Sequence, residues 1–451
     1  MKNQDFTVFR GGVHPTNGYD KALSNAKPIT EYTPKVVEIS MAQTGPSICE
    51  CLVKAGDHVE KGQLIGSPAN FFAVKLHASV SGTVKEIKMV PNGPREVPVC
   101  VIEVDEVQPP VEDKPYRHQL MDLSAYTKEQ LVALMEEAGI TGMGGAGFPS
   151  HVKFKPKDPI KYVLINAAEC EPFLTCDHRM LLEHSWEILN GVNAMIKAAG
   201  AEKGYICMED NKQDVADHLN KLLQGCDVPF EVKVLPTKYP QGGERQLILA
   251  VTGQEIPAGG LPASVGCIVA NAQSAKAMGD MVFAGIPSIS RCITITGLVA
   301  DPKNFLVPLG TPIRELVALA GGITEKNNKV ILGGPMTGPC IGTEMTGDDI
   351  DKCVTKVNGG LLVLENDTLV ESNCIRCGGC VEVCPAGLTP FKIDQAFRAG
   401  KLDLCEAMHA TECIACGCCS YTCPAKRELT FYNTKARDAV KAAIRERSMK
   451  K

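Results

Sequence analysis

The chain has 451 residues, 52 acidic and 47 basic, with a net charge of −5 at pH 7, a balance that argues against a nucleic-acid partner. Its length predicts several domains at roughly one per 150 residues, and it has no run of about 18 apolar residues that could span a membrane. Because "MKNQDFTVFRGG" lacks the apolar core of a signal peptide, we expect a cytoplasmic protein whose 21 cysteines stay reduced.

The first third of the chain has the sequence pattern of a β-domain. The stretches "VEISMAQTGPSICECLVKAGDHVEKGQLIG" and "FFAVKLHASVSGTVKEIKMV" alternate short apolar runs with glycine turns, which predicts strands. The pattern resembles the barrel-sandwich fold of lipoyl and biotinyl carrier domains. A carrier needs a modified lysine at a hairpin tip, but the tip falls at Phe71 and Phe72, and Lys75 comes later, inside the next strand. We therefore expect a carrier fold without a carried group, followed by a linker over residues 107–118.

A glycine-rich loop comes next, "GITGMGGAGFPSHVKF", with the spelling G-x-G-x-x-G at Gly142, Gly144 and Gly147. In a dinucleotide-binding fold a strand enters such glycines and a long helix leaves them. Here "KEQLVALMEEAG" has helical spacing and ends at Gly139, and Pro149 interrupts the segment after the glycines. Glycines can still turn amides toward a phosphate or lie against a flat ring. The loop therefore predicts a nucleotide-like ligand in an unusual setting.

Three strand-to-helix turns after this loop carry polar residues. "KYVLINAAECEPFLTCDHRML" places Asn166, Glu169 and Glu171 where a strand turns into a helix. Glu244 opens the helix after "FEVKVLPTKYPQGG", and Asn271 lies in "IVANAQSAKAM". Taken singly, such residues are more often caps or solvated turns than ligands. Polar groups at strand ends of open α/β sheets face a crevice, however, so three such turns beside one glycine loop favour a ligand site.

The pattern changes again from residue 291. "RCITITGLV" alternates strictly, and "GTPIRELVALAGG" predicts a compact helix with Thr311 as N-cap and Pro312 at its first position. "KVILGGPMTG" adds a strand and a glycine turn. This stretch predicts a β-grasp-like module. The tail "FYNTKARDAVKAAIRERSMKK" predicts a short basic helix that is solvated, with a membrane surface or a partner as the alternative.

Nine cysteines lie in two runs, "CIRCGGCVEVCP" and "CIACGCCSYTCP", that fit C-x2-C-x2-C-x3-C-P. In this pattern three cysteines bind one [4Fe–4S] cluster and the fourth binds the other. Structural zinc is the alternative, but zinc explains neither the third cysteine nor the proline. We expect Cys418 to be a bystander and two short helices to meet at Gly400 between the runs. The predicted ligands are Cys374, Cys377, Cys380 and Cys423 for cluster 1, and Cys413, Cys416, Cys419 and Cys384 for cluster 2.

A ligand site placed before two clusters suits a flavin. Nicotinamide exchanges a hydride, whereas an iron–sulfur cube exchanges single electrons. A flavin can do both, so a nicotinamide could reduce the clusters through it.

Several motifs carry a family resemblance. "GMGGAGFPSHVKF" with "NAAECEP" resembles the flavin- and NADH-binding subunit of respiratory complex I. From "FRGGVHP" through "YPQGGE" and "GGPMTG" to the cluster motifs, the whole order resembles the C subunit (RnfC) of the Rnf complexes, membrane-bound ferredoxin:NAD oxidoreductases that pump sodium ions or protons. The resemblance implies a noncovalent FMN, two [4Fe–4S] clusters and NAD(H) as substrate. It also implies a peripheral place on the cytoplasmic face of the cell membrane, with the ferredoxin-like B subunit and integral membrane subunits as partners.

The resemblance also assigns flavin-site residues. Lys153 falls on the cation near the phosphate, and Asn271 falls on an asparagine beside it. Phe148 could stack on a ring or pack in the interior. Met143 replaces an arginine of complex I and Ala168 replaces an aspartate, so the contacts of those side chains differ. The implied cofactor-binding residues are Gly142, Gly144, Gly145, Gly147, Phe148, Lys153, Asn166, Glu169, Glu171, Glu244 and Asn271.

The expected fold is multidomain, α/β and α+β. Two other functions are weighed: a free-standing flavin and cluster reductase of the cobalamin-reductase type, and a nonenzymatic iron–sulfur scaffold. The preceding β-domain argues against the first, because those proteins begin near the glycine loop; the intact loop and Lys153 argue against the second. The expected parts are a barrel-sandwich (lipoyl-like) region, 1–110; an α/β FMN/NADH-binding domain, 120–285; a β-grasp (SLBB-like) module, 290–345; a two-cluster ferredoxin-like helical domain, 365–432; and a basic C-terminal helix, 433–451.

Overall fold

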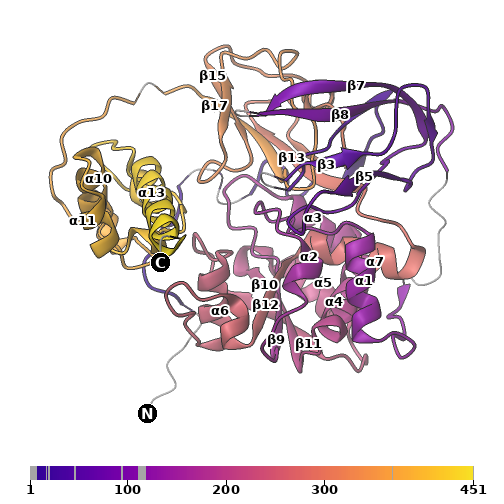
Figure 1. The fold of residues 1–451 in the computed structure, drawn as a ribbon, viewed down its shortest axis with the longest axis horizontal. Helices are drawn as coiled ribbons and strands as arrows, with labels where there is room; N and C mark the ends of the chain where they lie inside the picture. Colours follow the sequence, from indigo (N-terminus) through magenta and orange to yellow (C-terminus); the bar gives the residue numbers. More distant parts are fainter. Residues whose placement is uncertain are drawn as a thin grey trace.

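The computed structural model describes residues 8–16, 18, 21–44, 47–92, 95–109, 118–367 and 369–449 (Figure 1). Residues 110–117 of the expected linker lie outside this set. None of the described helices combines the length and the apolar character needed to cross a membrane.

The N-terminal β-domain consists of two small antiparallel sheets around one core. Alternation drives it: Val37 and Ile39 on one strand and Cys100 and Ile102 on its partner are all buried. The predicted all-β domain is confirmed. Lys75, however, precedes a strand rather than lying inside one. The sheets are β2-β8-β7-β4 (Val36–Ser40, Arg95–Val104, Gly82–Asn92, His58–Val59) and β3-β5-β6 (Cys49–Cys51, Leu64–Pro68, Leu76–His77).

The α/β domain is built on a parallel sheet of order β11-β10-β9-β12 (Phe230–Leu235, Lys203–Glu209, Tyr162–Asn166, Cys267–Asn271). Both faces are covered, because neighbouring residues of β9 enter different cores: Val163 packs under helices α1, α4 and α7, and Leu164 packs under α6. The domain's helices are α1 (Lys128–Glu137), α2 (Ser150–Lys153), α3 (Cys176–Glu183), α4 (Ser185–Ala199), η2 (Asp210–Lys212), α5 (Gln213–Leu222), α6 (Glu244–Thr252), η3 (Pro262–Val265) and α7 (Ala272–Ala284).

The β-grasp-like module contains a six-stranded sheet, and the strand predicted from "RCITITGLV" is its β13. The helix α8 (Ile313–Leu319) has Pro312 as its N-cap, so the prediction that Thr311 is the N-cap was wrong. The hydroxyl of Thr311 instead donates to the carbonyl of Pro308. The sheet takes two strands from beyond residues 290–345, β1 and β17. Its order is β1-β14-β13-β17-β15-β16 (Thr30–Glu31, Lys303–Pro308, Ser290–Gly297, Gly360–Glu365, Asn328–Leu332, Cys340–Thr343).

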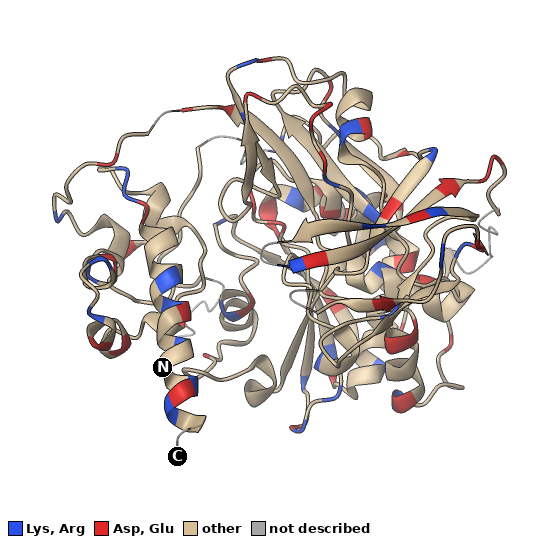
Figure 2. Ribbon diagram, turned by 45° about the horizontal axis from the view of Figure 1, so that its top comes forward, with Lys and Arg blue, Asp and Glu red and all other residues tan. Residues whose placement is uncertain are grey.

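The C-terminal domain is helical and lies at the left of Figure 1. The two predicted helices about Gly400 are confirmed as α10 (Pro390–Arg398) and α11 (Leu402–Ala407). The tail is not merely solvated, because Ala436 and Val440 of α13 (Leu429–Met449) are buried in the domain's own core. Figure 2 shows charges of both signs along α13. The remaining short helices are α9 (Gly379–Glu382), η4 (Ala410–Glu412) and α12 (Cys418–Tyr421).

Helices α4 and α7 approach so closely that only glycine fits at their crossing. A Cβ on Gly191 would lie 1.7 Å from the carbonyl oxygen of Ala275, and one on Gly279 would lie 2.0 Å from that of Glu187. The two glycines therefore let the backbones touch.

Replacing Gly279 with alanine should lower the stability of the α/β domain by about 1–3 kcal/mol, because the added methyl group must push the two helices apart. The urea midpoint of unfolding measures this. Lys221→Ala, on the exposed side of α5, is the control and should leave the midpoint nearly unchanged. Equal midpoints for both variants would contradict the close packing.

Candidate functional site

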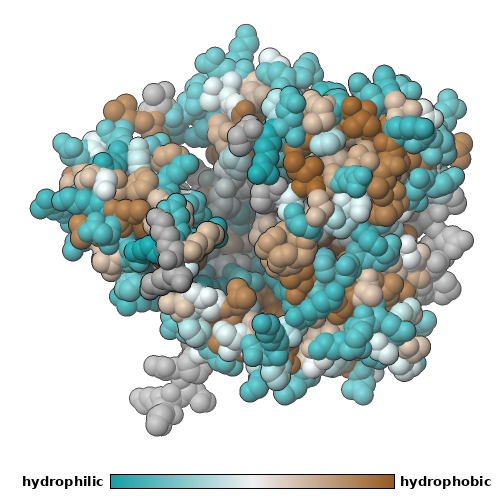
Figure 3. All heavy atoms as spheres, in the orientation of Figure 1, coloured by the Kyte–Doolittle hydropathy of each residue, from teal (hydrophilic) through white to brown (hydrophobic). Residues whose placement is uncertain are grey.

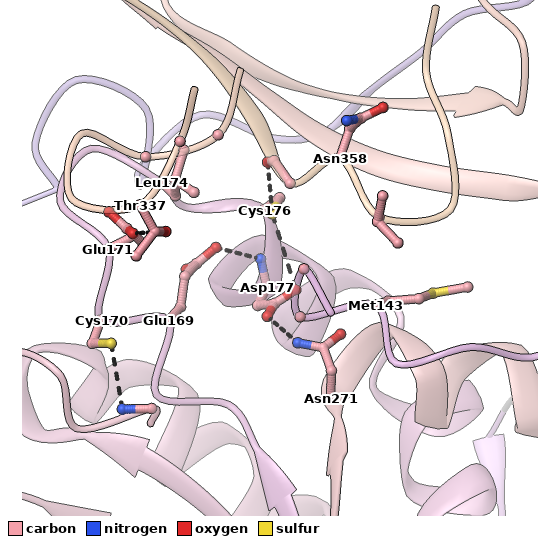
Figure 4. A pocket seen from close by; sticks show the side chains of 18 of the residues that line it. Met143, Glu169, Cys170, Glu171, Leu174, Cys176, Asp177, Asn271, Thr337 and Asn358 are labelled. Atoms are coloured by element: carbon pink, nitrogen blue, oxygen red, sulfur yellow. Dashed lines mark hydrogen bonds between the residues drawn. The ribbon is translucent and has the colours of Figure 1, made fainter. Parts of the chain in front are cut away.

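A cavity of about 570 Å³ opens where β9 and β12 end, a size typical of small-molecule sites. Figure 4 shows its walls, which come from the glycine loop, the turn after β9, the loop between β15 and β16 and the segment just before β17. Six of the predicted flavin-site residues line it: Gly144, Gly145, Asn166, Glu169, Glu171 and Asn271. The other five, Gly142, Gly147, Phe148, Lys153 and Glu244, are not among the lining residues.

The glycine loop closes on itself beside the cavity. The N–H of Gly142 donates to the carbonyl of Phe148 (2.8 Å), and the N–H of Gly147 donates to that of Gly142 (3.1 Å). Gly145 has φ +111°, where a side chain would be strained, and the space where its Cβ would stand is open to 4 Å. Gly142 and Gly147 thus shape the loop, and Gly145 presents bare backbone to the cavity.

Lys153 is not among the residues that line the cavity, and its ammonium group has protein partners. Its Nζ donates to the carbonyl of Val269 (2.8 Å) and to a carboxylate oxygen of Glu244 (3.3 Å). The two predicted residues therefore form an ion pair with each other. Their contact with a cofactor stays a prediction.

The cation in the cavity wall is Arg291, which sequence reasoning missed. Its side chain is buried, its Nε donates to the carbonyl of Asn358 (2.9 Å), and its Nη2 donates to that of Met143 (2.8 Å). Its Nη1 finds no hydrogen-bond partner among the residues that the structure describes. A buried charged donor without a partner is costly, so this atom fits an anionic group in the cavity, such as a phosphate. The one signal in the sequence is a single charge at the start of the otherwise uncharged strand "RCITITG".

Two buried lysines hold the turn after β9. Lys21 donates to the carbonyls of Glu169 (2.7 Å) and Leu174 (2.9 Å) and also to that of Glu171. Lys212 donates to the carbonyl of Ala168 (2.6 Å). Burial lowers the pKa of Lys21. These contacts satisfy carbonyls of a turn in which Glu169 has φ +44°.

The two glutamates of this turn reach in different directions. Glu169 accepts the backbone N–H groups of Asp177 (2.7 Å) and His178 (3.2 Å), where α3 begins. Asp177 in turn accepts the amide of Asn271 (2.7 Å), and burial raises its pKa. These polar groups thus bind one another as well as lining the cavity.

Glu171 instead binds the loop of residues 333–338, here called the latched loop, to the turn after β9. Its carboxylate accepts the N–H of Met336 (3.0 Å) and the hydroxyl of Thr337 (Figure 4). Burial raises the pKa of Glu171, and these hydrogen bonds oppose that shift. The loop therefore closes the side of the cavity that faces the C-terminal domain.

The cysteine runs gather around two small cavities. Both runs use the same backbone turn, with positive φ at Arg376 (+58°) and Gly378 (+82°) in the first and at Ala415 (+56°) and Gly417 (+85°) in the second. One cavity is lined by Cys374, Cys377, Cys380 and Cys423, and the other by Cys384, Cys413, Cys416, Cys418 and Cys419. The structure therefore brings together the two predicted sets of four, with the fourth cysteine of each run crossing to the other.

The chemistry of these donors fits a thiolate-bound cluster. Burial raises the pKa of the Cys384 and Cys413 thiols, so their thiolates need a bound metal to compensate the charge. Cys418, expected to be a bystander, is fully buried and lines the second cavity.

Family models match four parts of the chain. They describe an RnfC barrel sandwich hybrid domain over residues 7–107, a Nuo51 FMN-binding domain over 135–280, an SLBB domain over 292–339 and a 4Fe-4S binding domain over 368–388. The expected order of folds is thus confirmed.

Solved structures share the fold of a large part of the chain. An NAD+-reducing [NiFe]-hydrogenase in the air-oxidised state matches with a TM-score of 0.50 and 19% identity. The match covers 66% of this chain and 56% of that one.

Relatives match over most of their length. The C subunit of the Na(+)-translocating ferredoxin:NAD(+) oxidoreductase complex of Acetobacterium woodii is 39% identical over 433 residues, 94% of this chain and 94% of the relative. The C subunit of the proton-translocating ferredoxin:NAD(+) oxidoreductase complex of Clostridium ljungdahlii is 40% identical, over 85% of this chain and 82% of the relative. With this coverage and this order of domains, the chain belongs to the family of C subunits of ion-translocating ferredoxin:NAD(+) oxidoreductase complexes.

Proposed function

We propose that this chain passes electrons between NAD(H), an FMN in the cavity and two [4Fe–4S] clusters, and onward to membrane-bound partners. FMN supplies the exchange between hydride and single-electron chemistry. The chain's own residues bind and orient the cofactors: Arg291 offers a donor to an anionic group, Gly145 leaves its backbone open, and the latched loop covers one side.

The observation that carries this proposal is a hydrogen bond from the α/β domain, next to the cavity wall, to the second cysteine run. The hydroxyl of Tyr239 donates to the carbonyl of Cys416 at 2.7 Å. Tyr239 packs in one buried cluster with Cys170, which lines the cavity, and with Cys418. The two sites are therefore joined by packed side chains.

The contact also favours an order of transfer. The cavity that would hold cluster 2 lies against the α/β domain, whereas the cavity that would hold cluster 1 includes Cys377, which is exposed. Ile375 beside it is 68% exposed. Electrons would therefore pass from the flavin to cluster 2, then to cluster 1, and leave from the exposed side of the C-terminal domain.

The partners, the location and the domain boundaries of this chain are part of the same proposal. The partners would be the other subunits of such a complex, including a ferredoxin-like B subunit and integral membrane subunits, with this chain bound peripherally on the cytoplasmic face. Figure 3 shows a hollow between the C-terminal domain and the rest, and apolar residues gathered over the upper right of the same face. The domain boundaries given above are proposed too, and the four family matches support them.

The fourth cysteine of each run, which lines the cavity of the other run, gives the first test of this proposal. Protein purified without oxygen should hold about eight irons with matching acid-labile sulfide. Cys384→Ala should damage the cluster of the second run and Cys423→Ala that of the first, whereas Cys418→Ala should keep the full iron content. Iron analysis with electron paramagnetic resonance spectra separates the two. Bound zinc without sulfide would contradict the assignment.

Flavin binding distinguishes the two candidate cations. Arg291→Lys keeps the charge but loses the planar fork, so FMN affinity should fall by about 1.5–3 kcal/mol, measured by titration of flavin fluorescence. Lys153→Ala is the comparison: the predicted phosphate contact requires a loss of similar size, whereas the ion pair with Glu244 alone requires little change. Unchanged affinity in both variants would remove both residues from the flavin site.

The order of cofactors predicts what the isolated protein does with NADH. Absorbance at the flavin band should fall first, and cluster reduction should follow if the cluster potentials are close enough to that of nicotinamide. Protein stripped of FMN should show no response to NADH, although dithionite should still reduce its clusters. Full NADH oxidation by flavin-free protein would overturn the proposed entry of electrons.

A further inference from the structure

The motif "FRGGVHP" near the N-terminus has no role in the proposed function so far. Residues 9–13, here called the strap, lie between the α/β domain and the predicted site of cluster 2. At its start, Lys238 donates to the carbonyl of Phe9 (2.9 Å) and stands 4.6 Å from the centre of the Phe9 ring. Phe9 is itself buried. The strap is therefore anchored on the α/β domain.

The middle of the strap touches a predicted ligand of cluster 2. The N–H of Gly12 donates to the carbonyl of Val383 (2.9 Å). A Cβ on Gly11 would lie 2.9 Å from both the carbonyl carbon and the carbonyl oxygen of Cys384. Gly11 has φ +74° and Gly12 has φ +82°. Glycine is needed at both positions because each has a positive φ, and at Gly11 also because the strap backbone lies close to that of Cys384.

The end of the strap reaches Tyr239. Val13 and Tyr239 exchange two backbone hydrogen bonds, of 2.8 and 2.9 Å, and the Tyr239 hydroxyl reaches the carbonyl of Cys416. On the same side, a Cβ on Gly417 would lie 2.6 Å from the carbonyl oxygen of Met336, in the loop latched by Glu171. Two predicted ligands of cluster 2, Cys384 and Cys416, are thus held from the α/β domain.

We propose that the strap and Tyr239 fix cluster 2 at a set separation from the flavin cavity, and so set the rate at which an electron passes between them. The inference rests on the proposed function. In this step the reduced flavin loses one electron and the cluster gains it, and no bond to the strap forms or breaks. Gly11, Gly12 and Tyr239 act as positioning residues.

The first test is Gly11→Ala, with Gly56→Ala as its matched control. Both glycines have positive φ, but a Cβ on Gly56 meets nothing within 4 Å, so the control carries the backbone strain without the clash. In stopped-flow mixing with NADH, both variants should keep the wild-type rate of flavin reduction. Only Gly11→Ala should slow the later phase of cluster reduction. Hydrogen exchange of the backbone around Cys384 should also speed up in Gly11→Ala alone.

The second test removes a single hydroxyl. Tyr239→Phe should slow cluster reduction, by at most about fivefold, because losing one neutral hydrogen bond can lower the population of the held position by no more than that factor, with iron and FMN content unchanged. Tyr32→Phe is the control, because it also removes one tyrosine hydroxyl, whose bond of 2.6 Å goes to the Glu315 carboxylate in the β-grasp-like module, away from both cofactor sites. If Gly11→Ala fails to hold cluster 2, Tyr239→Phe decides the question.

The outcomes separate the two proposals. Wild-type protein whose flavin ignores NADH, although dithionite reduces it, would overturn the proposed function. A wild-type response with cluster reduction equally fast in Gly11→Ala, Tyr239→Phe and their controls would overturn the strap alone.

Discussion

The site depends on two buried ammonium groups. Lys21 and Lys212 together donate to four carbonyls of the turn that follows β9. A turn of this kind leaves carbonyls without regular partners, and each would be costly if buried alone. Because the lysines satisfy them, the chain can hold Glu169 at positive φ and direct Glu169 and Glu171 to different partners. The start of α3 depends on one of these glutamates, and the loop over the cavity depends on the other.

A buried polar contact also joins the β-grasp-like module and the N-terminal β-domain to the glycine loop. Lys356, wholly buried just before β17, donates to the carbonyl of Gly139 at the start of the glycine loop (2.6 Å) and reaches that of Lys75 in the β-domain (3.3 Å). Three domains therefore meet at one ammonium group. Such contacts have fixed geometry, so the domains around the cavity hold defined positions rather than merely lying together.

The sequence was informative where local pattern decides structure. Alternation predicted the β-domain, strand-to-helix turns predicted Asn166 and Asn271 at one sheet edge, and cysteine spacing predicted the two sets of four that the structure brings together. It was uninformative where distant segments meet. Arg291 looked like part of a strand, Lys153 turned to Glu244, and nothing local indicated that Lys21 would reach the acidic turn. The basic tail predicts a solvated helix, whereas the structure buries Ala436 and Val440 of α13 in the core of the C-terminal domain.

The strap also has a consequence for how the molecule is made. Gly12 is synthesised long before Val383, to which it bonds. Such a contact closes a very long loop, and its entropy must be lost before the contact contributes anything. The strap therefore cannot reach its place until the cysteine-rich domain has been synthesised. Until then the second cluster site stays open on that side, which leaves a period during biosynthesis when iron and sulfide can be delivered to it.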